Sequence, residues 1–434
     1  MLLHLYRLLW KIARPALRLH RRLGDGFEHR LVPPRWPLPQ EGRGDGTGAP
    51  RRLWLHSASG GEAYLVYELL HILSAWPGGT CDALLCTSCT RQGLEILQRA
   101  QRELQREDWR MDVNYLPLDE LDLMRRAVRQ AFGPPAVPGG PKVLALLETE
   151  LWPGLLQACR EYGAHVIILN GRLTEGSFRA YRFMRPALRR IAPERILAVS
   201  PENLERFRLL FGPKTSCSLM PNIKFDRAAN APDALALNCG DRYNPVIALA
   251  SIREEEEELI LPVLGELLRL EPRCIPVLAP RHLHRLEAWE KRLRNQRLDF
   301  IRASSGVDWE QGGRIVLWDS FGQLHRLYAL AGTVFVGGSL APLGGQNFLE
   351  PLNYGLIPCV GRFWDNFAWV GEELFELGLA RRVQDAGELP PMLLEQLKSP
   401  PDKALVRERF TGYVAPRRGG TRQAAEALRV LLQE

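Results

Sequence analysis

Short apolar runs alternate along this chain with stretches of helical periodicity, and this alternation constrains the fold more than any other feature. Residues 53–56 form the first run, and a helical stretch follows it up to about Ser74. Parallel strands need long crossover connections, usually helices, so this order of elements indicates a parallel sheet covered on both faces. Further runs of the first half are residues 83–86, 143–147, 166–169 and 196–199. We therefore expect an α/β fold with a doubly wound parallel sheet.

The pattern begins again near Pro245, which indicates a second domain of the same class. Its apolar runs are residues 246–250, 274–278, 315–317 and 334–336. A chain of 434 residues suits two α/β domains of roughly 200 residues each. We place the boundary within residues 222–245 and expect an N-terminal domain at 24–226 and a C-terminal domain at 227–434.

Positive charge is concentrated at the N-terminus. The whole chain has a net charge of +7, which favours acidic partners, and residues 1–23 carry six basic side chains and no acidic one. The charges leave no run of about 20 apolar residues for a spanning helix, and no signal-peptide cleavage site follows. We interpret residues 1–23 as a basic amphipathic helix on an anionic membrane surface, with Trp10 at the interface. The alternative is an ordinary basic helix packed on the domain.

Two cysteines form a CxxC pair, Cys86 and Cys89, in a chain with eight cysteines. No second CxxC and no histidine pair at zinc spacing accompanies it, so we expect no metal site. Cys86 ends an apolar run, where free cysteine commonly serves as a small hydrophobic residue. The cysteines therefore indicate a reduced, cytosol-facing protein.

Polar clusters follow several of the expected strands. They occupy residues 57–62, 148–152 and 170–172. In doubly wound sheets, ligands bind beyond the carboxyl ends of the strands. These clusters are therefore candidate site residues.

A glycine-rich segment follows the run at 334–336. We expect a helix to begin after it at Asn347, with Asn347 and Glu350 forming a capping box. Glycine allows close approach of the backbone to a ligand, and a helix N-terminus favours an anion. Glu350 would alternatively hold ribose hydroxyls. The other interpretation is a strand–loop–helix connection without a ligand. Five consecutive glutamates, 254–258, are expected to be the solvated first turns of another helix.

Eight separated segments, in order, resemble the motifs of the bacterial Kdo transferases. These GT-B glycosyltransferases move 3-deoxy-D-manno-octulosonic acid (Kdo) from CMP-Kdo to the lipid A precursor. The resemblance spans residues 51–420 approximately and is carried by 57–62 (SASGGE), 148–153 (ETELWP), 170–174 (NGRLT), 222–226 (NIKFD), 280–282 (PRH), 319–324 (DSFGQL), 335–339 (FVGGS) and 344–351 (GGQNFLEP). Gln323 departs from the family pattern, which has glutamate there. The resemblance implies a GT-B fold, with two Rossmann-like domains facing a cleft.

The resemblance also implies roles for individual residues. Glu62 would be the proton acceptor, and Glu148 and Lys224 would stabilise the transition state. From the residues alone, Glu62 is better explained as a carboxylate at a helix N-terminus, and Lys224 would suit a surface lysine. The implied CMP-contacting residues are Pro280, Arg281, Phe321, Gly322, Gln323, Asn347, Phe348, Leu349 and Glu350. Candidates for contacts with the acceptor or its phosphates are Ser59, Gly60 and Arg172.

The implied reaction is inverting transfer of Kdo from CMP-Kdo to the lipid A precursor (lipid IVA), without a metal or other cofactor. The implied partners are CMP-Kdo, the lipid A precursor and anionic inner-membrane lipid, at the cytoplasmic face of that membrane. Two alternatives stay open. One is a GT-B transferase or nucleotide-sugar epimerase with a different donor. The other is a non-enzymatic basic protein that binds membrane or nucleic acid, which is disfavoured because no aromatic–basic RNA-binding pattern is present.

Overall fold

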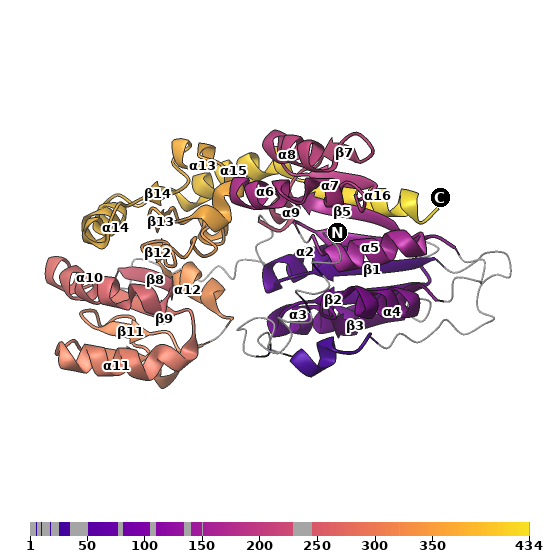
Figure 1. Ribbon diagram of the computed structural model, residues 1–434. Helices are drawn as coiled ribbons and strands as arrows, with labels where there is room; N and C mark the ends of the chain where they lie inside the picture. Colours follow the sequence, from indigo (N-terminus) through magenta and orange to yellow (C-terminus); the bar gives the residue numbers. More distant parts are fainter. Residues whose placement is uncertain are drawn as a thin grey trace. The chain divides into compact units, whose positions relative to one another are not determined.

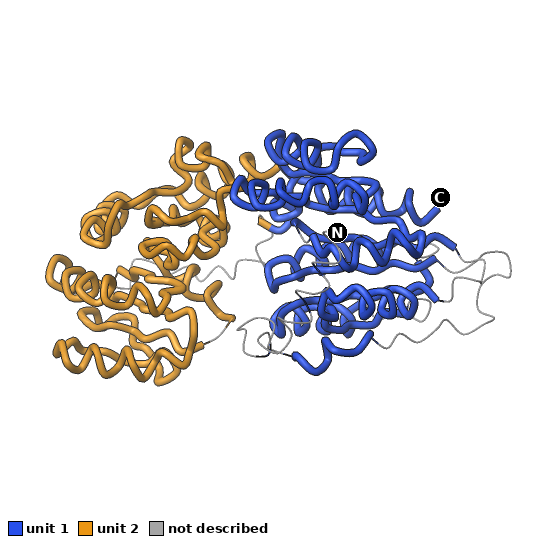
Figure 2. Tube along the Cα trace, viewed as in Figure 1, with its two compact units in different colours: residues 1–227, 417–434 blue, residues 228–416 orange. Residues whose placement is uncertain are grey.

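The chain folds into two compact α/β units (Figure 2). The computed structural model describes residues 6, 10, 18, 26–34, 51–76, 81–104, 110–133, 140–149, 151–228, 245–320 and 322–433. Unit 1 comprises Met1–Arg227 and Arg417–Glu434, and unit 2 comprises Ala228–Pro416. The chain thus passes from unit 1 to unit 2 and back.

Unit 1 is built on a seven-stranded sheet in which every neighbouring pair is parallel. The strand order is β3-β2-β1-β4-β5-β6-β7. The strands are β1 (Arg52–Ser57), β2 (Ala83–Ser88), β3 (Arg110–Tyr115), β4 (Lys142–Leu147), β5 (His165–Gly171), β6 (Arg195–Ala198) and β7 (Ser216–Leu219). The order reverses at β1, since β2 and β3 lie on one side of it and the later strands lie on the other. This confirms the doubly wound parallel sheet.

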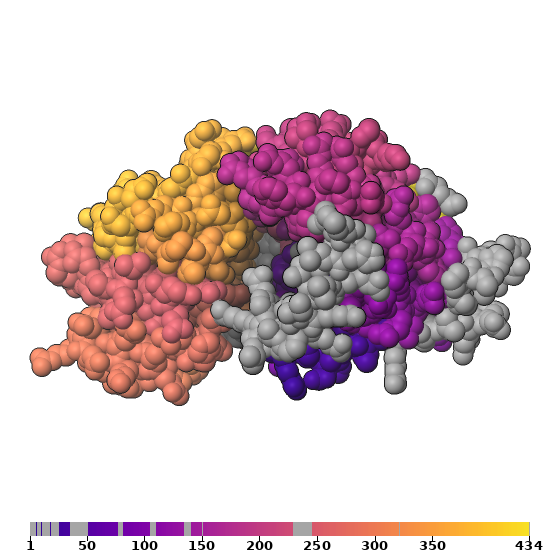
Figure 3. Space-filling model, in the orientation of Figure 1, coloured from indigo at the N-terminus to yellow at the C-terminus, as the bar shows by residue number. Residues whose placement is uncertain are grey.

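Helices cover both faces of this sheet (Figure 1). They are α2 (Gly60–Ser74), α3 (Arg91–Glu103), α4 (Leu121–Phe132), α5 (Pro153–Tyr162), α6 (Glu175–Arg182), α7 (Arg185–Leu188), α8 (Pro201–Phe211), α9 (Lys224–Ala228) and α16 (Gly420–Leu431), with a 3-10 turn η1 (Phe27–Arg30). Successive side chains of β1 point to opposite faces of the sheet, and both sets are apolar, so both faces are covered. Leu53 and Leu55 pack with α2 and α3, and Trp54 packs with α4 and α5. The outer surface around α6–α8 is seen in Figure 3.

The C-terminal segment differs from our expectation. We assigned residues 227–434 to the second domain, but Arg417–Glu434 belong to unit 1. The reason is the apolar face of α16, where Ala424, Leu428 and Leu431 are buried in the same core cluster as α2 and the β4 strand. Asp226 fixes the start of α16, because its carboxylate accepts from the backbone nitrogens of Gly419 and Thr421, each at 2.6 Å.

Unit 2 repeats the architecture with a second parallel sheet, in the order β10-β11-β9-β8-β12-β13-β14. Its strands are β8 (Val246–Ile252), β9 (Ile275–Pro280), β10 (Phe300–Arg302), β11 (Ile315–Leu317), β12 (Thr333–Val336), β13 (Pro358–Val360) and β14 (Arg381–Arg382). Its α-helices are α10 (Glu257–Leu270), α11 (Leu286–Asn295), α12 (Leu324–Leu330), α13 (Glu373–Glu376), α14 (Leu389–Lys398) and α15 (Lys403–Val414). The order reverses at β8, between β9 and β12.

The expected helix at Asn347 is absent. Residues 344–348 have no regular structure, and only a 3-10 turn, η5 (Pro351–Tyr354), follows. The side-chain oxygen of Asn347 accepts from the backbone nitrogen of Leu349 at 3.2 Å. Such a local bond offers the backbone an alternative to helix formation. The capping box that we expected between Asn347 and Glu350 is therefore wrong.

Most of residues 1–23 lie outside the described residues, but two side chains show contacts with unit 1. The Tyr6 hydroxyl donates to Asp119 Oδ2 at 2.5 Å, and Trp10 packs against a small cluster of Phe27, Leu118 and Leu123. At Trp10 the structure therefore matches the packed-helix alternative. Association with a membrane stays a prediction. Among the described residues, no helix has the length and apolar character needed to cross a bilayer.

Candidate active site

Two carboxylates follow the strands at which the order of the unit 1 sheet reverses. Glu62 lies in the first turn of α2, which follows β1, and Glu148 comes directly after β4. Strands β1 and β4 are parallel neighbours, so both residues lie at the same carboxyl edge. In open α/β sheets this reversal point is where ligands bind. The topology thus brings together two residues that are 86 positions apart in the chain.

The backbone and a serine hydroxyl hold the Glu62 carboxylate in place. Its Oε2 accepts from the backbone nitrogen of Ala58 at 2.6 Å, and its Oε1 accepts from the Ser59 hydroxyl at 2.9 Å. Ser59 is also the N-cap of α2, since its Oγ accepts from the backbone nitrogen of Glu62 at 3.4 Å. The side chains of Ser59 and Glu62 thus bond to each other and to the backbone at the start of α2. Ser59, which we expected to contact the acceptor, thus orients Glu62, and Gly60 is the buried first residue of α2.

Glu148 forms an ion pair with Lys224. The Lys224 ammonium lies 2.5 Å from Glu148 Oε1, and the side chains are 23% and 15% exposed. Glu148 has a φ of 59°, in the left-handed region that residues other than glycine seldom adopt. Its backbone nitrogen donates to the Leu169 carbonyl at 2.9 Å, which fixes this turn on the neighbouring strand β5. Strained residues of this kind concentrate at functional sites.

Two asparagines position Lys224. Asn170, at the end of β5, accepts from the backbone nitrogen of Ile223 at 2.9 Å through its side-chain oxygen. Asn222 accepts from the backbone nitrogen of Lys224 at 3.0 Å. Asn170 is buried and also has a positive φ, 56°. Sequence reasoning placed both asparagines in motifs but gave neither a role, and the structure shows that they anchor the lysine.

The environment shifts the ionisation of Glu62. Burial raises the pKa of its carboxyl, and the charge of Glu148 raises it further. The Ala58 N–H, the Ser59 hydroxyl and the Lys224 charge act in the opposite direction, and the pKa is about 7. Glu62, Glu148 and Lys224 therefore form one electrostatically coupled group. Arg172, half-buried, follows β5 at the same edge of the sheet.

Those of the expected nucleotide-contacting residues that the structure describes lie at the corresponding edge of unit 2. Pro280 ends β9, and the backbone nitrogen of Arg281 donates to the Ile252 carbonyl at 2.8 Å. Gln323 is the N-cap residue of α12, and Gly322 precedes it with a φ of 73°. Phe321 lies outside the described residues.

In the segment from Asn347 to Glu350, the groups available to a ligand are the backbone and the polar side chains of Asn347 and Glu350. Phe348 is fully buried against Phe367 and other aromatic rings, and Leu349 is buried as well. These two side chains belong to the core, so only their backbone is available to a ligand. Glu350 is half-buried; burial raises the pKa of the Tyr354 hydroxyl, and the Glu350 charge raises it further.

Sequence reasoning missed Glu256. We expected it on a solvated helical turn, but it is fully buried and lies in a 3-10 turn, η2 (Glu254–Glu256). Its Oε1 accepts from the backbone nitrogens of Ser339 at 2.9 Å and Leu340 at 2.8 Å, and its Oε2 from that of Gly338 at 2.5 Å. The amides of this glycine-rich loop, which we expected to face a ligand, thus bind a carboxylate of the protein.

Gly337 has the close approach that only glycine allows. A Cβ at this position would lie 2.9 Å from Glu256 Oε2 and 2.8 Å from the Ser251 carbonyl oxygen. The signal in the sequence was the position of Glu256 shortly after β8, the strand at which the sheet order reverses. The glutamates on either side of it obscured that signal.

The cysteines of the CxxC pair are buried in unit 1. Burial raises the pKa of the Cys86 thiol well above its ordinary value. The Cys89 sulfur lies 3.9 Å from His56 Nε2, and burial lowers the pKa of that imidazole to about 3. Within the described parts of the chain, no group of three or more His, Cys, Asp or Glu side chains is arranged to hold a metal ion.

Known proteins resemble this chain in sequence. The family model for 3-deoxy-D-manno-octulosonic-acid transferase (Kdo transferase) matches residues 25–227. A 3-deoxy-D-manno-octulosonic acid transferase of Bordetella pertussis is 31% identical over 325 residues, covering 70% of this chain and 74% of that protein. A transferase of the same name from Haemophilus influenzae is 29% identical over 305 residues, covering 68% of this chain and 70% of that protein.

A solved structure shows the same fold at much lower identity. The crystal structure of UDP-GlcNAc 2-epimerase from Neisseria meningitidis superposes with a TM-score of 0.54 at 12% identity, covering 87% of this chain and 99% of that one. This likeness concerns the fold, which is GT-B, with a parallel α/β sheet in each unit. The 31% identity with the Bordetella protein covers more than two thirds of both sequences, and identity of this extent shows the family as well as the fold. The chain belongs to the Kdo transferase family of glycosyltransferases.

Proposed function

We propose that this Kdo transferase takes Kdo from CMP-Kdo and transfers it to a hydroxyl of the lipid A precursor, with Glu62 as the general base. The main support for this proposal is the position and ionisation of Glu62. Glu62 is a half-buried carboxylate at the carboxyl edge of the sheet, within the electrostatic influence of Glu148, and its pKa is about 7. A base whose pKa lies near the working pH combines a useful ionised fraction with enough proton affinity.

The chemistry follows from this arrangement. The acceptor hydroxyl gives its proton to Glu62 while its oxygen forms a bond to the anomeric carbon of Kdo. The bond from that carbon to the phosphate oxygen breaks, and CMP leaves with the electron pair. Displacement from the opposite face inverts the anomeric centre, so a β-linked donor gives an α-ketoside. The Ser59 hydroxyl and the Ala58 N–H hold the Glu62 carboxylate in a fixed orientation for the proton transfer.

Charge stabilisation would come from Lys224 and Glu148. Negative charge shifts from the acceptor oxygen toward the leaving phosphate during transfer, and Lys224 supplies a nearby cation. The ion pair with Glu148 fixes the position of that ammonium. A fixed charge stabilises a transition state without reorganising, which is the basis of electrostatic catalysis.

Unit 2 would hold the nucleotide. Arg281 carries a guanidinium that suits phosphate, and Glu350 carries a carboxylate that suits ribose hydroxyls. Gly322, Gln323, Pro280 and the backbone from Asn347 to Leu349 would complete the contacts. We propose that no metal is required, and that the protein works at the cytoplasmic face of the inner membrane, where it would meet lipid acceptor and anionic lipid.

The test is mass spectrometry of the product formed from CMP-Kdo and tetra-acylated lipid A precursor. The wild-type protein should add Kdo to the acceptor. Glu62→Gln should lower the rate by roughly 10²–10⁴-fold, because the amide cannot accept the proton. Glu95→Gln, at an exposed glutamate on α3, is the matched control and should retain the wild-type rate. Transfer by Glu62→Gln within threefold of wild type would remove Glu62 from the role of base.

A binding experiment tests the donor separately. Thermal unfolding is followed with CMP, UDP and GDP at equal concentrations. CMP should raise the unfolding temperature most, because at equal concentration the ligand with the lowest Kd stabilises the folded state most. A larger shift with UDP would favour a transferase or epimerase with a different donor.

A further inference from the structure

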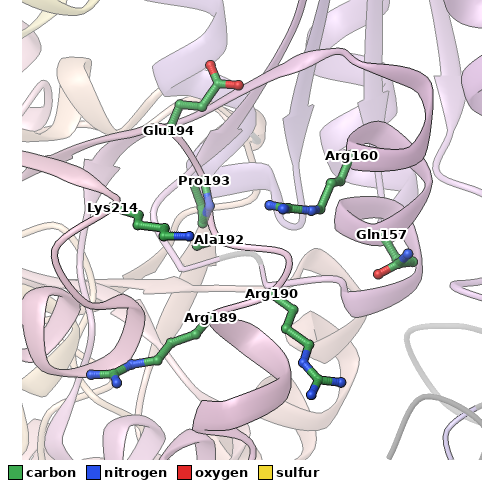
Figure 4. A pocket seen from close by; sticks show the side chains of 8 residues that line it. All are labelled: Gln157, Arg160, Arg189, Arg190, Ala192, Pro193, Glu194 and Lys214. Atoms are coloured by element: carbon green, nitrogen blue, oxygen red, sulfur yellow. The ribbon is translucent and has the colours of Figure 1, made fainter.

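A basic pocket lies on unit 1, away from Glu62 and Glu148. It has a volume of about 600 Å³ and is lined by Gln157, Arg160, Arg189, Arg190, Ala192, Pro193, Glu194 and Lys214. These residues come from the last turns of α5, the segment that leads into β6, and the turn before β7. In Figure 4, Arg160 and Lys214 extend toward one another, with Ala192 and Pro193 between them.

The positive charges of this pocket are not balanced by neighbouring carboxylates. Four of the lining side chains are basic, and Glu194 is the acidic one. The Glu194 carboxylate already accepts from His165 Nδ1 at 2.6 Å, and in Figure 4 it points away from Arg160 and Lys214. Within the described parts of the chain, Arg160, Arg189, Arg190 and Lys214 form no ion pair.

A nearby arginine shows the contrast. Arg125, on α4, donates to both carboxylate oxygens of Glu161 at 2.7 and 2.9 Å and to Asp122 at 2.9 Å. Glu161 follows Arg160 in the chain, and its carboxylate accepts from Arg125 and from the Gln157 amide rather than from Arg160.

The walls of the pocket are held together by backbone and hydroxyl hydrogen bonds. The Thr215 hydroxyl, which is buried, donates to the Pro193 carbonyl at 2.9 Å, and the backbone nitrogen of Ser216 donates to the Glu194 carbonyl at 2.8 Å. Gly212 ends α8 with a φ of 83°, and a Cβ there would lie 3.2 Å from Arg189 Nε. The two loops that carry Arg189 and Lys214 are therefore fixed against each other before any ligand arrives.

We propose that the basic pocket binds a small, multiply charged anion of the phosphate or pyrophosphate class, either free or as the headgroup of an anionic lipid. Four like charges around one concave surface repel one another, and a multivalent anion relieves that repulsion. Guanidinium groups match the geometry of phosphate oxygens, and a pocket of this size accepts a pyrophosphate with bridging water.

This site is distinct from the candidate active site. The pocket residues precede β6 and β7, so they lie at the amino edge of the parallel sheet, whereas Glu62 and Glu148 follow strands β1 and β4 at the carboxyl edge. An anion in the basic pocket therefore does not occupy the position of donor or acceptor. The proposal is independent of the identity of the sugar nucleotide.

The test is isothermal titration calorimetry of the full-length protein with sodium pyrophosphate at low salt, with CMP present in excess. The wild-type protein should bind pyrophosphate at submillimolar concentration, and the affinity should fall as salt is added. The double variant Arg160→Gln/Lys214→Gln should bind at least tenfold more weakly. Arg99→Gln/Arg422→Gln is the matched control, because it removes the same charge from two exposed i,i+4 ion pairs of unit 1, and it should stay within twofold of wild type.

Circular dichroism melting establishes that both double variants fold. No heat from pyrophosphate with the wild-type protein, or equal weakening in the pocket and control variants, would overturn the proposal. Cosedimentation with vesicles of phosphatidylglycerol and phosphatidylcholine then separates the two sources of the anion. Loss of vesicle binding only in the pocket variant identifies a lipid headgroup. Vesicle binding equal to that of the control, together with lost pyrophosphate binding, identifies a free anion.

Discussion

The Lys224 ammonium lies 2.5 Å from Glu148 Oε1, and the charges of this ion pair both act on the half-buried carboxylate of Glu62. The Glu148 charge raises the pKa of Glu62, and the Lys224 charge lowers it. Solvent screens charges of this kind only weakly when the side chains are largely buried. The proton affinity of Glu62 is therefore raised by its burial and by Glu148, and lowered by the hydrogen bonds from Ala58 and Ser59 and by the Lys224 charge.

Glu148→Gln should shift the pH dependence of catalysis. The variant removes a negative charge near Glu62, so the pKa of Glu62 should fall below about 7. The acidic limb of the kcat/KM profile reports the ionisation of the base in the free enzyme, and it should move to lower pH. The maximal rate should also fall, because Lys224 loses its partner.

The measurement is kcat/KM between pH 5 and pH 9 for the wild-type protein and the variant. An acidic limb at the same pH in both proteins would show that Glu148 does not act on the ionisation of the base. Glu68→Gln, at a glutamate further along α2, is a suitable control and should leave the profile in place.

Glu62→Gln should stabilise the folded protein at alkaline pH. The pKa of Glu62 is raised from 4.5 to about 7, so the folded state disfavours the ionised carboxylate. Stability is therefore lost as the pH rises from 4.5 to 7, and the loss is complete above 7. A shift of this size corresponds to at most about 3 kcal/mol. The amide variant does not ionise, and its oxygen can still accept from Ala58.

Urea unfolding at pH 5 and pH 8 checks this prediction. The difference in stability between variant and wild type should favour the variant at pH 8 and shrink at pH 5. A difference that does not depend on pH would contradict the raised pKa. Together with the activity measurement, the experiment tests whether this position trades stability for catalysis.

Much of the fold could be predicted because the strands are apolar and regularly spaced. The run at 143–147 became β4, and the run at 53–56 became the middle of β1, since a buried parallel strand needs apolar residues on both faces. Glu62, Glu148 and Lys224 were named through the family resemblance. From the residues alone, Glu62 could be interpreted either as a general base or as a carboxylate at a helix N-terminus. The structure shows that the Glu62 carboxylate accepts from the Ala58 N–H just before α2, and that the Glu62 backbone nitrogen donates to the N-cap hydroxyl of Ser59.

The expectations that the structure did not match failed for physical reasons. The helix expected at Asn347 did not form because the asparagine side chain bonds to the backbone of Leu349 instead. The placement of α16 in unit 1 depends on long-range packing against α2, which no local pattern encodes. Glu256 was missed because one glutamate among five cannot be recognised as buried from its neighbours.

Glu256→Gln should destabilise unit 2 and weaken nucleotide binding. Oε1 of Glu256 accepts from two backbone nitrogens and Oε2 from two more, those of Gly338 and Arg253. In the amide variant, one oxygen becomes an NH₂ group that faces two N–H donors. Leaving a buried donor unsatisfied costs about 1–3 kcal/mol, so a loss of roughly 2–6 kcal/mol is expected for the two donors.

Thermal unfolding and calorimetric CMP binding check the prediction on Glu256. Glu258→Gln, at the exposed glutamate two residues along, is the matched control and should behave like the wild-type protein. If Glu256→Gln unfolds at the wild-type temperature, the loop does not depend on this carboxylate.

A hydrogen bond between Tyr6 and Asp119 connects the N-terminal segment to unit 1. The buried Asp119 carboxylate accepts from the Tyr6 hydroxyl at 2.5 Å and from the backbone nitrogens of Gly154 and Leu155 at 2.8 and 2.7 Å, at the start of α5. Tyr6→Phe removes one donor to this carboxylate and should lower the stability of unit 1 by roughly 1.5–3 kcal/mol. Burial raises the pKa of Asp119 to about 7, and loss of the tyrosine donor should raise it further.

Deletion of residues 1–23 should cost more than Tyr6→Phe, because it also removes Trp10 from the cluster of Phe27 and Leu118. Arg18→Gln, which breaks an exposed ion pair with Glu28, should change stability little and serves as the control. Urea unfolding ranks the three proteins, and vesicle sedimentation of each reports membrane binding separately. A truncated protein that unfolds like wild type but no longer sediments with anionic vesicles would make the segment an anchor without a packing role. A destabilised protein that still sediments would make it a structural part of unit 1.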